Sequence, residues 1–166
     1  SKSFNLAAHR TGYMFTDNKE LMAKIVEVGN HHRGLLNTMG TIASNAAYKH
    51  GATYMDDMQA YIDGNSHFLE NFCAENMKDV KYSVHEGTYL AWLDCKAVAA
   101  KLGRPEGDDR MGDMLKKFFI EKAGVNINPG ENYGRTGVGY VRMNLGTTHA
   151  KLHGALNAIE KACNAL

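Results

Sequence analysis

Arg142 is a residue whose type and setting suggest ligand binding. It lies within an alternating segment, 140–145, in which Val141, Met143 and Leu145 share one face and Arg142 lies on the other. A planar guanidinium in such a place can hold a carboxylate or a phosphate through two parallel hydrogen bonds. The same alternation also fits an arginine that faces solvent, so the spacing leaves both interpretations open.

A glycine-rich segment, 129–139, directly precedes that alternating stretch. Its four glycines would allow a ligand to approach the backbone closely. It has neither the GxGxxG spacing followed by a helix nor a GK[ST] ending, so it is no phosphate-binding fingerprint. A long turn between two strands explains it equally well.

The sequence gives little support for a metal site or for a catalytic triad. The tight clusters of metal-ligand type are His31-His32 and His85-Glu86, and neither has HExxH spacing. Adjacent residues on a helix or strand cannot easily face one ion, so we expect no metal site. The sequence has no GxSxG motif, and no cysteine stands near a convincing histidine partner.

The first twelve residues carry a more specific pattern. A small residue, Ser1, precedes Lys2, and Arg10 follows eight positions after the lysine, with Gly12 two positions later. This arrangement resembles the lysine motif of class I/II aminotransferases and their relatives. Thr11 departs mildly, because the family usually has an apolar residue there.

The resemblance continues in family order along all 166 residues. Five further segments match: 45–48 with Gly51, 86–94, 121–125, 129–130 and 140–145. The motifs EGTYLAWLD and PGENYGRTGVGYVRMN are most similar to those of the cystathionine β-lyase, or C–S lyase, group. The chain is thereby identified as a member of the pyridoxal-phosphate-dependent fold type I superfamily.

The resemblance implies a cofactor and a role for four residues. Pyridoxal 5′-phosphate would form a Schiff base with Lys2, whose freed amine would then act as general base on the substrate Cα proton. Ser1 and Arg10 would hold the cofactor phosphate, and Arg142 would bind the α-carboxylate of an amino-acid substrate. The substrate would be cystathionine or a cysteine-like amino acid.

Three functions stay open at this point. The resemblance favours C–S bond cleavage, but the same residues also serve an aminotransferase, and a small domain without cofactor could be an assembly module. The chain begins at Ser1 without a methionine, so we expect a fragment that is inactive without a missing N-terminal half. The family also implies a homodimer.

Composition is that of an ordinary globular protein. Hydrophobic residues make up 44%, charged residues 22%, and the net charge is +1, so nothing suggests a nucleic-acid binder. There is no apolar run long enough for a membrane span, and no leader is apparent, so we expect a cytoplasmic protein. Three widely spaced cysteines indicate buried or half-buried thiols in a reducing compartment.

These residues must be positioned by an α/β fold with an α+β small domain. We expect residues 1–55 to be the end of a large cofactor-binding domain, and 56–166 to be the small domain, entered by a long helix. The patterns predict strands at 11–16, 82–85, 88–94, 125–128 and 140–145, and helices at 17–30, 38–50, 55–77, 109–123 and 148–165.

Overall fold

The structure is a computed structural model, which describes residues 2–30, 37–104 and 110–166. The chain divides into two compact units, Ser1–Met58 and Gln59–Leu166, and each is described by itself. The border falls inside helix α3 (Ala52–Asn76), which is 25 residues long. Within the described ranges, no helix is both long and apolar enough to cross a membrane.

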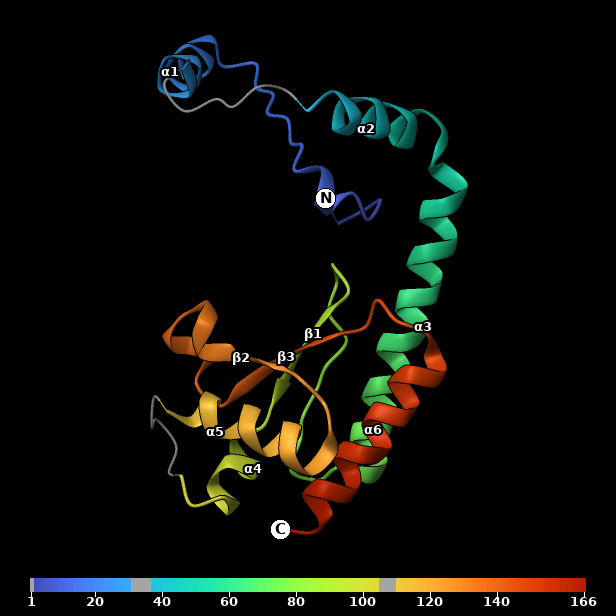
Figure 1. Cartoon of the computed structure of the whole chain (residues 1–166), viewed down its shortest axis with the longest axis vertical. Helices are drawn as coiled ribbons and strands as arrows, with labels where there is room; N and C mark the ends of the chain where they lie inside the picture. Colours follow the sequence, from blue (N-terminus) through green and yellow to red (C-terminus); the bar gives the residue numbers. More distant parts are fainter. Residues whose placement is uncertain (1, 31–36, 105–109) are drawn as a thin grey trace. The chain divides into compact units, whose positions relative to one another are not determined.

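The first unit consists of α1 (Lys19–Asn30), α2 (Thr38–His50), the beginning of α3 and an N-terminal segment with one 3₁₀ turn, Ala7–His9 (Figure 1). Asn37 caps the N-terminus of α2, because its side-chain oxygen accepts a hydrogen bond from the Gly40 N–H at 3.1 Å. The amide nitrogen of the same side chain donates to the His9 carbonyl oxygen at 2.7 Å. Asn37 thus ties the start of α2 to the N-terminal segment.

The predictions for this unit are partly confirmed. The predicted helix 38–50 coincides with α2, and the Gly51 N–H closes it by donating to the Ala47 carbonyl oxygen at 2.8 Å. The first helix begins at Lys19 and not at position 17, because Asn18 supplies the cap by accepting from the Leu21 N–H at 3.0 Å. The predicted strand at 11–16 is wrong, since among the described residues no strand pairs with it.

The second unit is built on a small antiparallel sheet. Strand β3 (Tyr140–Asn144) lies in the centre, between β1 (Leu90–Asp94) and β2 (Asn128–Pro129), in the order β1-β3-β2 (Figure 1). The register places Arg142 of β3 opposite Trp92 of β1 and Asn128 of β2. Arg142 therefore occupies the middle of the sheet.

One face of this sheet is buried in the core, and the other carries the polar and aromatic side chains. The helices α4 (Lys96–Lys101), α5 (Met111–Phe118) and α6 (His149–Asn164) contribute to the same core. In Figure 1, α6 runs beside the second half of α3. The buried members include Ala91 and Leu93 of β1, Val141 and Met143 of β3, Met111 and Leu115 of α5, and Leu152 and Leu156 of α6.

Several predicted boundaries in this unit need correction. Residues 82–85 are not a strand, because the backbone there turns to a side chain of α3: the Val84 N–H donates to Glu70 Oε1 at 3.3 Å. The helix predicted at 109–123 is α5 followed by a π-helical turn, Phe119–Ala123, and position 109 lies outside the described residues. The strand predicted at 125–128 is β2, at Asn128–Pro129, and α4 was not predicted.

The remaining predictions hold. The strands at 88–94 and 140–145 contain β1 and β3, and the helices at 55–77 and 148–165 correspond to α3 and α6. The second unit has helices packed around a small three-stranded antiparallel sheet, which confirms its α+β character. All three cysteines are buried with free thiols, as their spacing predicts.

Candidate active site

Lys2 lies in a tight turn at the start of the first unit. Its carbonyl oxygen accepts a hydrogen bond from the Asn5 N–H at 3.3 Å, and Asn5 adopts a left-handed conformation with a φ of 53°. The Lys2 side chain is exposed and makes no hydrogen bond or ion pair with any residue the structure describes. Its amine is therefore available for a reaction partner. Ser1, the preceding residue, lies outside the described residues.

Arg10 is held in an unusual backbone conformation. It follows the 3₁₀ turn with φ 47° and ψ 43°, and its N–H donates to the Ala7 carbonyl oxygen at 3.1 Å. A residue other than glycine in this left-handed region costs on the order of 1–3 kcal/mol, and such strain concentrates at functional positions. The guanidinium itself is exposed, and in the described part of the chain no acidic group pairs with it.

Aromatic contacts hold the segment that carries these two residues. The Phe4 ring lies edge-on to Tyr48 of α2 at 5.3 Å and stacks with Tyr54 of α3 at 6.3 Å. Beside it is a hollow of about 360 Å³. Five of its eight lining residues carry hydroxyl groups: Ser3, Thr11, Tyr13, Ser44 and Tyr48. The sequence around Lys2 thus borders a polar hollow within the first unit.

Arg142 is the functional candidate of the second unit. The side chain is half-buried on the outer face of the sheet, and the guanidinium carbon lies 4.7 Å from the centre of the Tyr133 ring. Across residues 2–30, 37–104 and 110–166, no carboxylate or carbonyl oxygen bonds to it. The N–H donors of the guanidinium are therefore available to an incoming anion.

An aromatic row continues from Arg142 across the sheet; we use this name for Tyr133, Trp92 and Tyr140. Tyr133 and Trp92 meet edge-on, with ring centres 5.7 Å apart, and Trp92 stacks on Tyr140 at 5.9 Å. At the far end, Lys96 Nζ lies 5.0 Å from the centre of the Tyr140 ring. The sequence did not single out this row; its one usable signal was that Trp92 is the single tryptophan of the chain.

The glycine-rich segment 129–139 brings Tyr133 to Arg142. It forms two short 3₁₀ turns, Gly130–Tyr133 and Arg135–Gly137, whose glycines 130 and 137 pack so closely that neither has space for a Cβ. Glu131 Oε1 accepts from the Gly139 N–H at 3.4 Å and links the two ends of the segment. The segment is therefore a turn between the strands β2 and β3, and it also brings the Tyr133 ring to the Arg142 guanidinium.

The predicted site residues are distributed over both units. Lys2 and Arg10 belong to the first unit and Arg142 to the second. In the described residues, no group of three or more histidine, cysteine, aspartate or glutamate side chains could hold a metal ion. His31 and His32 lie outside the described residues, and His85 bonds through Nδ1 to the Tyr82 hydroxyl at 2.7 Å.

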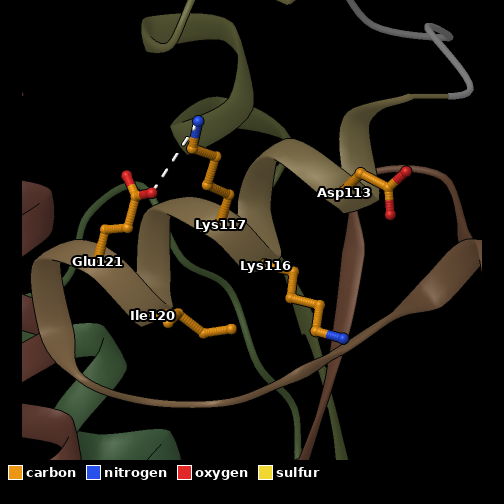
Figure 2. Close-up of a pocket in the computed structure, with 5 residues that line it drawn as sticks. All are labelled: Asp113, Lys116, Lys117, Ile120 and Glu121. Carbon is orange, nitrogen blue, oxygen red and sulfur yellow. Dashed lines mark ion pairs between the residues drawn. The ribbon is translucent and has the colours of Figure 1, made fainter.

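A second hollow, of about 280 Å³, lies on α5 and the turn after it, and Figure 2 shows its five lining residues. They are Asp113, Lys116, Lys117, Ile120 and Glu121. Lys117 Nζ pairs with Glu121 Oε1 at 3.9 Å, one helical turn away, and both side chains are largely exposed. Such alternating charges are typical of a solvated helix face, and none of the candidate residues lies there.

Comparisons with known proteins agree with the sequence resemblance. The family model "Aminotransferase class I and II" matches residues 1–159. MalY of Escherichia coli K12 is 30% identical over 165 residues, which are 96% of this chain and 40% of that protein. The cystathionine beta-lyase PatB of Bacillus subtilis 168 is 30% identical over 163 residues, 98% of this chain and 40% of PatB.

The fold agrees as well. Cystalysin of Treponema denticola, whose crystal structure contains pyridoxal 5′-phosphate, superposes with a TM-score of 0.85 at 24% identity. That match covers 98% of this chain and 39% of cystalysin. The chain therefore spans about two fifths of the length of each of these three proteins.

Proposed function

The chain belongs to the class I and II aminotransferase family, and from this premise we propose that it is part of a pyridoxal-phosphate-dependent lyase that cleaves C–S bonds in sulfur amino acids. The lyase assignment is supported by the similarity to PatB, which is named a cystathionine beta-lyase. The substrate would be cystathionine or a cysteine-like amino acid.

One observation carries the substrate class. Arg142 presents a guanidinium that is half-buried, lies over an aromatic ring, and has no acidic partner among the described residues. A cation in this state binds a carboxylate through two parallel hydrogen bonds, which fixes both the position and the orientation of the substrate. An α-amino acid supplies that carboxylate next to the carbon that reacts.

The residues of the first unit fit the cofactor. Lys2 has an amine with no partner among the described residues, and such an amine can react with an aldehyde. Arg10 has a guanidinium with no partner among the described residues, and such a group can bind a phosphate. When bound, pyridoxal phosphate supplies an electron sink for negative charge at Cα. Lys2 would hold the cofactor and, once free, take the Cα proton, while Arg10 and the Ser1 hydroxyl would hold the phosphate.

The domain roles follow from the same premise. Residues 1–55 would be the end of a large cofactor-binding domain and 56–166 the small domain, close to the border between the two compact units at Met58 and Gln59. The rest of the large domain would come from an N-terminal half, and the complete enzyme would be a cytoplasmic homodimer. We expect the 166-residue chain to be inactive without that half.

The complete protein encoded by the gene provides the test. We expect it to release pyruvate from cystathionine without a keto-acid acceptor. Turnover that requires such an acceptor would instead identify an aminotransferase. Borohydride reduction after addition of pyridoxal phosphate, followed by mass spectrometry, should place the label on Lys2. A label on another lysine would overturn the assignment, and no label at all would favour an assembly module.

A further inference from the structure

We propose that Tyr133 is a positioning residue that holds the Arg142 guanidinium over its ring so that the N–H donors point free toward a substrate carboxylate. The proposal rests on the proposed function of Arg142 as the carboxylate-binding residue. It adds a second residue, on a different segment of the chain, to the substrate side of the site.

The first argument is the way Arg142 is held. Its guanidinium carbon lies 4.7 Å from the centre of the Tyr133 ring, which is within the range of a cation–π interaction. An arginine held by an acid gives up part of its donor fork to that acid. A ring face attracts the cation but accepts none of its in-plane N–H groups, so all of them stay available to a ligand.

The second argument is the way Tyr133 itself is fixed. Its ring and that of Trp92 meet edge-on with their centres 5.7 Å apart, and Trp92 is directly opposite Arg142 in the sheet. The close packing of Gly130 against Gly137 and the hydrogen bond from the Gly139 N–H to Glu131 fix the segment from which Tyr133 projects. Tyr133 therefore contacts the sheet from a loop that is held by its own packing and hydrogen bond, although half of the tyrosine's surface is exposed.

The third argument is exposure. Tyr133 is half-exposed and Trp92 is 36% exposed, and neither belongs to the buried core. The ring contacts of Tyr133 are with Trp92 and with the Arg142 guanidinium. This arrangement favours orientation of Arg142 over stabilisation of the fold.

The experiment compares variants of the complete protein under turnover of its amino-acid substrate. We expect Tyr133→Leu, which keeps the bulk and removes the ring, to raise KM about three- to tenfold with kcat changed less than twofold. Tyr133→Phe keeps the ring and should restore most of the affinity. In an Arg142→Lys background, Tyr133→Leu should add little to the KM. A Tyr133→Leu KM within twofold of wild type would overturn the proposal.

Tyr140→Leu is the matched control, because Tyr140 belongs to the aromatic row and contacts Trp92, whereas the row meets Arg142 through Tyr133. An equal rise in KM for Tyr140→Leu would show that the whole row matters and that Tyr133 has no special role. If Arg142→Lys leaves KM unchanged, the proposed function of Arg142 fails, independently of Tyr133.

A second readout needs neither cofactor nor turnover. In the NMR spectrum of the complete protein, the ring current of Tyr133 should shift the Arg142 Hε resonance upfield, with the assignment made from Arg142→Lys. Tyr133→Leu should return the resonance toward its random-coil position, and Tyr140→Leu should leave it in place. An Hε resonance that does not move in Tyr133→Leu would contradict the contact.

Discussion

The Asn65 side chain of α3 donates a hydrogen bond to the carbonyl oxygen of Leu145, directly after β3, at 3.0 Å. Its amide also donates to the Thr147 carbonyl oxygen at 3.1 Å, and only 2% of Asn65 is exposed. A buried amide that satisfies two backbone acceptors fixes the end of the strand that carries Arg142. This contact links the long helix α3 to the backbone that directly follows β3.

Asn65→Ala should lower the free energy of unfolding by about 1–3 kcal/mol, because the buried Leu145 carbonyl oxygen and the partly buried Thr147 carbonyl oxygen lose their donor. The measurement is urea denaturation of the 166-residue chain. Asn71→Ala is the control, since Asn71 lies on the same helix and is exposed. A loss for Asn65→Ala no larger than that for Asn71→Ala would show that the two hydrogen bonds contribute nothing net.

Gly112→Ala should destabilise the second unit by about 1–3 kcal/mol, because the new methyl group has no space. A Cβ at position 112 would overlap the Glu131 carboxyl group and lie 2.7 Å from the Pro129 Cβ. The melting temperature of the chain reports the effect. In contrast, Gly64 on α3 has nothing within 4 Å of a Cβ. Gly64→Ala should therefore raise the stability by up to about 1 kcal/mol.

The buried thiols should resist alkylation in the folded chain. Burial raises the pKa of Cys73 to about 12 and that of Cys163 to about 11, and it raises the pKa of Cys95 well above its ordinary value. Iodoacetamide at pH 8 should label none of them until the chain is unfolded in guanidinium, because the thiolate is the nucleophile. Native labelling of Cys95 at the rate seen in the unfolded chain would refute its burial.

The same shifts predict how stability depends on pH. A thiol with a pKa of 9.0 in the unfolded chain loses its proton before Cys73 and Cys163, which titrate near 12 and 11 in the folded chain. The folded state then holds more protons, so the stabilisation is complete below pH 9 and is lost as the pH rises toward 11 and 12. Urea titrations at pH 8 and pH 10 should show the decrease, and Cys73→Ala should reduce the difference between them.

Arg142→Ala in the complete enzyme should raise KM and lower kcat/KM, with the cofactor still bound. Loss of a charged, desolvated partner costs about 2–5 kcal/mol, which corresponds to roughly 30-fold or more in kcat/KM. Steady-state kinetics with cystathionine give the value, and the visible absorbance of the cofactor gives the control. An unchanged kcat/KM would remove Arg142 from the site.

Long periodic segments and the central strand were predictable from sequence because a single pattern determines each of them. The apolar spacing of α3 and the alternation around Arg142 depend on local residue order alone. Boundaries were harder where a side chain competes with the backbone. Asn18 caps the first helix and so makes it shorter than predicted. Glu70 accepts the Val84 N–H, which a strand at 82–85 would have donated to a neighbouring strand.

The candidate site was predictable only in part. The alternating segment made Arg142 a candidate, and the family resemblance gave it the role of binding a carboxylate. Its contact with Tyr133 arises from the packing of Gly130 against Gly137 in the loop that carries Tyr133. No period in the sequence encodes that packing. The roles proposed for Lys2 and Arg10 come from the family resemblance, and the structure adds the left-handed backbone of Arg10.

The border between the two compact units, at Met58 and Gln59, lies within the uninterrupted α3 rather than in a loop. Proteases cleave extended backbone at exposed loop tips, so brief digestion should spare this junction. Anyone who wishes to express the second unit separately must cut through regular hydrogen-bonded backbone. An expression boundary at Ala52, where the helix begins, would keep its first turns intact.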